Sequence, residues 1–127
     1  MNTLQSFRPG SGFLLMAGFC LFLLVSCNKE DTPDTVDCTG LTPTYTSDIK
    51  TILDASCAKS GCHDATSMAN NINLSTYSSA RNVSQGNRFL GAVQHKSGFM
   101  PMPQDGPKLS QDKIDLLTCW VQNGSPE

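Results

Sequence analysis

Apolar residues are unevenly spread along the chain, and their longest run lies near the N-terminus. Thirteen residues without a charged side chain, 13–25, follow the basic residue Arg8. A helix needs about 20 apolar residues to cross a bilayer, so this run is too short for a membrane span. A basic residue followed by roughly 7–15 apolar residues is typical of a secretory signal. We therefore expect residues 1–26 to direct export.

The first helix predicted beyond this run covers residues 44–57. Ile49, Ile52 and Leu53 recur at the spacing that places side chains on one helix face. Ser47 is the expected N-cap, because its hydroxyl oxygen could accept a backbone N–H of the first turn.

Two shorter helices are predicted in the middle of the chain, over residues 75–83 and 87–95. In the second, Leu90 and Val93 are expected to face inward. A stretch with three prolines and two glycines follows at residues 97–107, and it must form a loop because proline removes a helical hydrogen bond.

The strongest helical pattern lies at the C-terminus, over residues 110–123. Ser110 is its expected N-cap, and Gly124 suits the position after its last turn. Its expected apolar face consists of Ile114, Leu117 and Val121, flanked by Trp120. No segment shows convincing strand alternation, so we expect an all-α domain.

The end of the N-terminal signal contains a second motif, Leu24-Val25-Ser26-Cys27. It resembles the lipobox of bacterial lipoproteins, which implies cleavage before Cys27 and attachment of lipid to that residue. Acyl chains would then anchor the protein to a membrane. Residues 27–44 have the composition of a linker, so the folded domain is expected over residues 45–127. The expected location is the outer membrane, on its periplasmic or cell-surface side.

Composition narrows the functions that are compatible with the chain. The 127 residues carry a net charge of −2, so nucleic acid is not an expected partner. Positions 27–127 contain only 17 Leu, Ile, Val and Phe residues. Since chains with less than about a fifth of such residues build cores with difficulty, we expect help from a disulfide, a metal or a large apolar cofactor.

Four cysteines remain after the signal and the lipidation site are set aside. Cys119 points away from the apolar face of the last helix, and Cys38 lies in the linker. Exported proteins are exposed to oxidising conditions, so a disulfide between Cys38 and Cys119 is predicted.

The other two cysteines belong to the most informative motif, Cys57-Ala58-Lys59-Ser60-Gly61-Cys62-His63. Haem attachment commonly uses C-x-x-C-H, in which two sulfurs bond the haem vinyl groups and the histidine binds iron. Here four residues separate the cysteines, so attachment through one or through both thioethers remains open. The flexible residue Gly61 would let the longer loop bulge outward.

From Ser47 to Gly124 the chain resembles the small class I cytochrome c-like domain of bacterial exported lipoproteins, akin to planctomycete-type domains. The resemblance implies one covalent haem c, attached at Cys57 and Cys62, with His63 as proximal ligand and a methionine as distal ligand. The resembling segments are Asp48-Ile49-Lys50 through Cys57, Cys62-His63, Met102-Pro103, Leu109-Ser110 and Trp120-Val121-Gln122-Asn123-Gly124.

The distal ligand is a choice among three residues. Met102 lies between two prolines, which fits the Pro-Met-Pro pattern of the family, and it is the preferred candidate. Met100 and His95 are the alternatives. A methionine ligand favours ferrous iron and raises the reduction potential.

Two haem-free functions compete with this prediction. One is a binding or adhesion module with disulfides Cys57–Cys62 and Cys38–Cys119. The other is a metal-binding module built from Cys57, Cys62, His63 and His95. The two histidines leave no credible nucleophilic set, so we do not expect an enzyme. The resemblance to cytochrome c-like domains implies instead an electron carrier with an unspecified redox partner.

Overall fold

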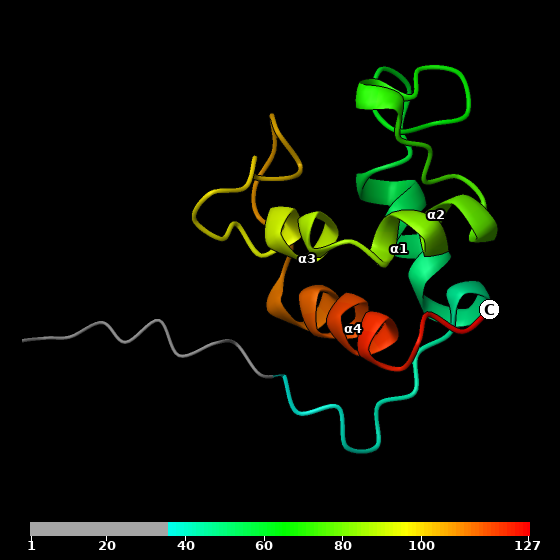
Figure 1. Cartoon of the computed structure of the whole chain (residues 1–127), viewed down its shortest axis with the longest axis vertical. Helices are drawn as coiled ribbons and strands as arrows, with labels where there is room; N and C mark the ends of the chain where they lie inside the picture. The colour runs from blue at the N-terminus through cyan, green and yellow to red at the C-terminus, as the bar shows by residue number, and fades with distance from the viewer. Residues whose placement is uncertain (1–35) are drawn as a thin grey trace, which may run out of the picture. The chain divides into compact units, whose positions relative to one another are not determined.

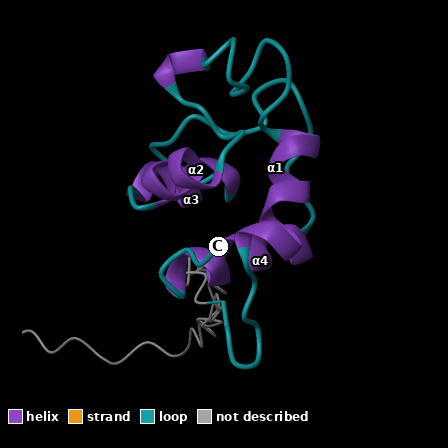
Figure 2. Ribbon diagram, turned by 90° about the vertical axis from the view of Figure 1, so that its right-hand side faces the viewer, coloured by secondary structure: helices purple, strands orange, loops and turns teal. Residues whose placement is uncertain are grey.

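The computed structural model describes residues 36–127, and the predicted signal peptide and Cys27 lie outside them. The described part contains the helices α1 (Lys50–Ser56), α2 (Tyr77–Ser84), α3 (Asn87–Val93) and α4 (Gln111–Gln122), and it has no strand (Figures 1 and 2). The predicted all-α class is therefore confirmed for this part of the chain. None of the helices among residues 36–127 is long and apolar enough to cross a membrane.

The first helical segment begins with a π-helical turn, η1 (Tyr45–Ile49), that leads directly into α1. Its N-cap is Thr44, whose Oγ1 accepts the N–H of Ser47 at 3.3 Å. The predicted N-cap, Ser47, was wrong because this residue already lies inside the helical turn. Thr44 has the extended backbone of an N-cap, with φ −116°. The Asp48 carboxylate also accepts the N–H of Thr44 at 3.0 Å.

The two middle helices are shorter than predicted, and a 3₁₀ turn, η2 (Ala69–Asn71), precedes them. The side chain of Thr76 caps α2, so this helix begins at Tyr77. Helix α3 ends at Val93 because His95 has a φ of +57°, which no right-handed helix allows.

The inward face of α3 also differs from the prediction. Phe89 and Val93 are buried, whereas Leu90 is only partly buried at the edge of the core. Phe89 therefore takes the core position that was assigned to Leu90.

Helix α4 begins after Ser110, as predicted, although the Ser110 side chain makes no capping hydrogen bond. Ile114, Leu117 and Trp120 are buried, while Val121 is only partly buried. Trp120, expected beside this apolar face, is fully buried in the core, and the C-terminal segment folds back over its side chain. The carbonyl of Pro126 accepts the Trp120 indole N–H at 2.7 Å.

The core forms where η1 packs against α4 and where α3 packs against both α2 and α4. Tyr45 lies near its centre, with its ring 5.4 Å from that of Tyr77 and 6.3 Å from that of Trp120. Tyr77 donates its hydroxyl proton to the carbonyl of Ser125 at 3.0 Å. The two tyrosines therefore join the first and last segments of the fold.

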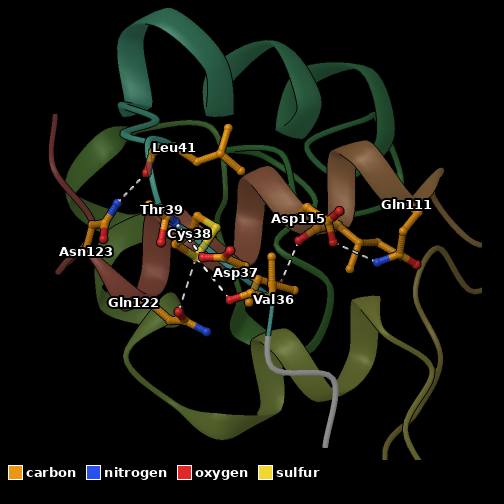
Figure 3. Close-up of a disulfide and its surroundings, with 12 residues drawn as sticks. Val36, Asp37, Cys38, Thr39, Leu41, Gln111, Asp115, Gln122 and Asn123 are labelled. Atoms are coloured by element: carbon orange, nitrogen blue, oxygen red, sulfur yellow. Dashed lines mark hydrogen bonds between the residues drawn. A yellow bond between two sulfur atoms is a disulfide. The ribbon is translucent and has the colours of Figure 1, made fainter.

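A disulfide links Cys38 to Cys119 on α4, with the two Cα atoms 5.4 Å apart, as predicted (Figure 3). Beside it, the Asn123 amide donates to the carbonyl of Leu41 at 3.0 Å. The described end of the predicted linker is thus held against the last helix.

Candidate functional site

The cysteine–histidine motif begins where α1 ends. The N–H of Cys57 donates to Leu53 O at 2.8 Å, and its carbonyl accepts the N–H of His63 at 3.1 Å. A turn lies between them, closed by a 2.9 Å hydrogen bond from Cys62 N–H to Lys59 O. Gly61 has a φ of +81°, which suits the third position of such a turn. The additional motif residues thus form an exposed turn that returns the chain to the helix end.

Backbone hydrogen bonds hold the other side of the motif. The carbonyl of His63 accepts the N–H of Leu74, and that of Cys62 accepts the N–H of Ala69, each at 2.8 Å. His63 is therefore fixed through both of its backbone groups. The long loop between α1 and α2, teal in Figure 2, is anchored at the motif.

A cavity of about 630 Å³ opens beside this motif, within the roughly 300–1,000 Å³ usual for ligand and cofactor sites. The residues that line it come from the motif, from the loop between the motif and α2, from helices α2 and α3, and from the proline-rich loop. The lining residues are Cys57, His63, Asn70, Ile72, Leu74, Asn82, Val83, Gly86, Asn87, Arg88, Phe89, Ala92, Val93, Gly98, Phe99, Met100, Met102 and Gln104. The fold thus brings three of the predicted haem-site residues to one apolar-walled cavity.

The imidazole of His63 has an unusual feature in this wall. Its Nδ1 atom is buried and has no hydrogen-bond partner. Nearly all buried polar atoms in proteins have a partner, so the hydrogen-bonding capacity of this ring nitrogen is unused, as it is at Tyr45 Oη and Gln94 Oε1.

The two motif cysteines differ in their surroundings. Cys57 is buried and lines the cavity, whereas Cys62 is exposed and is not among the lining residues. Both are free thiols, so the Cys57–Cys62 disulfide of the haem-free alternative is absent from the structure. Burial, and to a lesser degree the neighbouring Cys62, raise the pKa of Cys57 to about 11. The Cys57 thiol is therefore protonated at neutral pH.

The three candidates for the distal ligand are placed differently. Met102 and Met100 both line the cavity, but the Met100 side chain is 61 % exposed. Met102 is partly buried, and its N–H donates to Ala92 O at 3.0 Å. His95 does not line the cavity, and its Nε2 atom lies 3.0 Å from the Met102 carbonyl oxygen.

The metal-binding alternative lacks a ligand cluster. Within residues 36–127, no group of three or more His, Cys, Asp or Glu side chains is placed to hold a metal ion. Cys57, Cys62, His63 and His95 are thus not assembled as a set.

The sequence pattern gave no sign of Arg88, the only charged residue among residues 36–127 that lines the cavity. It directly precedes Phe89 at the start of α3, and nothing in the local pattern distinguishes it from Arg81, which is exposed on α2. Only the packing of α3 beside the motif reveals that Arg88 borders the site.

Asp64 has a structural role in the loop. Its carboxylate accepts the N–H groups of Ser67 and Thr66, and these hydrogen bonds, chiefly that from Ser67, lower its pKa. Asp64 therefore holds the turn that directly follows His63.

Comparisons of this chain with protein-family models, curated proteins and solved structures found no match.

Proposed function

We propose that this chain is a lipid-anchored, single-haem c-type cytochrome that carries electrons. One observation carries the proposal: Cys57, His63 and Met102 line the same cavity, although Met102 lies 39 residues beyond His63 in the sequence. A thiol, an imidazole and a thioether are the groups that covalent haem with His/Met ligation needs.

The other lining residues also suit haem. The group is a large apolar plane with two carboxylates at one edge. Ile72, Leu74, Phe89 and Val93 offer an apolar wall, and among the described lining residues Arg88 is the single cation and none is acidic. A cavity with one cation and no carboxylate favours a ligand that is apolar with an anionic edge.

Each residue has a distinct role in this proposal. His63 and Met102 would hold the iron, and Cys57, which lines the cavity, would attach the haem through a thioether. Cys62 is exposed and does not line the cavity, so it would supply a second thioether only if the turn at Gly61 opened toward the cavity. The bound haem would supply one-electron exchange between ferric and ferrous iron. A thioether ligand favours the ferrous form and raises the potential.

The remaining parts of the proposal concern location and partners. A lipid on Cys27 would tether the domain through the linker to the outer membrane, on its periplasmic or surface side. The partner would be another redox protein, and no substrate would be changed covalently.

The test is a haem stain of a denaturing gel together with a pyridine haemochrome spectrum. The chain is produced in a host that is competent in cytochrome maturation. We expect wild type to retain haem in the gel, because thioethers survive denaturation, and the Cys57→Ala/Cys62→Ala double variant to lose it. Single variants report whether one or both thioethers form. A colourless wild-type band would overturn the proposal in favour of a haem-free function.

A further inference from the structure

The proline-rich loop is attached to α3 by contacts that concentrate around Met102. The N–H of Met102 donates to Ala92 O at 3.0 Å, and its carbonyl oxygen lies 3.0 Å from Nε2 of His95. The Phe99 ring packs on Gly91 so closely that a Cβ there would lie 2.6 Å from ring atoms. These contacts give the loop a defined position against α3.

The hydrogen bond from His95 has only one possible direction. A carbonyl oxygen can only accept, so Nε2 must carry the proton and donate it. The backbone of His95 has a φ of +57°, in the left-handed region, and this conformation ends α3. The Nε2 atom is thereby engaged by the returning loop, and His95 does not line the cavity.

We propose that His95 is a positioning residue, which fixes Met102 as the distal ligand and does not bind iron itself. The inference rests on the proposed function. Because both the N–H and the carbonyl of Met102 are held, the peptide planes on its two sides are fixed relative to α3. The Met102 thioether therefore reaches toward the cavity from a fixed backbone position. Met100, with its exposed side chain, is the less constrained competitor.

Three variants of the full mature chain separate this role from a structural one. His95→Gln keeps an N–H donor at similar reach. His95→Asn tolerates the left-handed backbone, but its amide is too short to reach Met102. His95→Ala removes the ring. Equal haem content and equal far-ultraviolet circular dichroism establish that the variants compared are folded.

The readouts are the near-infrared band of ferric haem that marks methionine ligation, and the displacement of that ligand by added imidazole. We expect Met102→Ala to abolish the band and Met100→Ala to preserve it. In His95→Ala and His95→Asn, imidazole should displace the ligand at about fivefold lower concentration, the effect of one lost hydrogen bond. His95→Gln should resemble wild type.

Three results would overturn the inference. Unchanged imidazole competition in both His95→Ala and His95→Asn would show that the hydrogen bond does not hold the ligand. If the wild-type spectrum lacked the methionine band, and if only the His95 variants changed that spectrum, His95 would be the distal ligand. Wild-type protein without haem would instead refute the proposed function, on which this role depends. If His95→Ala does not fold, the comparison of His95→Asn with His95→Gln decides.

Discussion

Cys57 and Cys62 are close in sequence and carry the same chemical group, but their environments differ. Cys57 follows Leu53 at the end of α1, so its side chain continues the buried helix face. Cys62 follows the turn glycine and lies in solvent. The reactivity of a cysteine depends on both its exposure and its fraction of thiolate. The two sulfurs of the motif are therefore not equivalent before any haem is attached.

We predict that a thiol-alkylating reagent labels Cys62 before Cys57 in haem-free protein at pH 7. The pKa of Cys57 is raised from 9.0 to about 11, so little of it is thiolate, and its burial slows access further. The difference in rate should exceed about tenfold, as measured by mass spectrometry of peptides. Labelling of Cys57 should accelerate as pH rises toward 11. Equal rates for the two cysteines at pH 7 would contradict the buried position of Cys57.

In the proposed holoprotein, Arg88 is the residue whose charge should tune the reduction potential of the haem. A cation near the iron favours the reduced, less positive state, so Arg88→Gln should lower the reduction potential. An interaction of about 1 kcal/mol corresponds to a shift on the order of 40 mV for one electron. Arg81→Gln is the matched control, because Arg81 is exposed like Arg88 but does not line the cavity. If redox titration gave the two variants equal reduction potentials, Arg88 would have no electrostatic effect on the proposed haem.

At the scale of elements, the site depends on how two loops return to helices. The first leaves α1 at Cys57 and returns at His63 through the turn at Gly61. The second leaves α3 at His95 and brings Met102 back to the carbonyl of Ala92. Backbone hydrogen bonds close both loops, so they act as extensions of α1 and α3. Helices provide the rigid part of the cavity, while loops carry the groups proposed to bind iron.

The turn that follows His63 should be sensitive to acid because Asp64 holds it. The lowered pKa of Asp64 means that the native state favours the carboxylate. Its contribution to stability is therefore present above the ordinary pKa of 3.8 and is lost as pH falls through the folded-state value. In urea unfolding at pH 7, Asp64→Ala should be less stable than wild type.

Two comparisons check this assignment. The difference between Asp64→Ala and wild type should shrink as the pH is lowered below 3.8. Asp64→Asn keeps an oxygen acceptor for the two N–H groups, so it should lose less stability than Asp64→Ala. A difference between wild type and Asp64→Ala that does not change with pH would rule out the carboxylate as its source.

At the scale of the whole domain, the two ends of the described chain are tied to the same helix. The disulfide binds Cys38 to α4, and Pro126 accepts hydrogen bonds from Trp120 and from the N–H of Tyr45. These links compensate for a core with few large aliphatic residues. In the proposed holoprotein, haem would add apolar contacts to the core residues Phe89 and Val93, which line the cavity.

Removal of the disulfide should destabilise the domain substantially. The bridge spans 81 residues, and the loop-entropy model assigns about 4 kcal/mol to a loop of this length, as an upper value. We expect Cys38→Ser/Cys119→Ala to lower the free energy of unfolding by about 2–4 kcal/mol in denaturant titrations. Peptide mapping of unreduced wild type should recover the two cysteines in one linked fragment. An unchanged unfolding midpoint, or Cys38 recovered as a free thiol, would contradict the assignment.

The sequence by itself determined the features that depend on local spacing and chemistry. The four α-helices, the pairing of Cys38 with Cys119 and the burial of Ile49, Ile52 and Leu53 were predicted and confirmed. Helical periodicity depends on residues that are three and four positions apart in the sequence, so it can be recognised without knowledge of the tertiary structure.

Only the tertiary structure decided which partner each side chain meets. Trp120 is fully buried because the C-terminal segment covers it, with Pro126 O accepting its indole N–H, whereas Val121 is only partly buried. Arg88 borders the cavity because α3 packs beside the motif, and His95 reaches Met102 only because the loop returns to α3. These contacts join residues from separate segments, and their geometry depends on packing that no local pattern encodes.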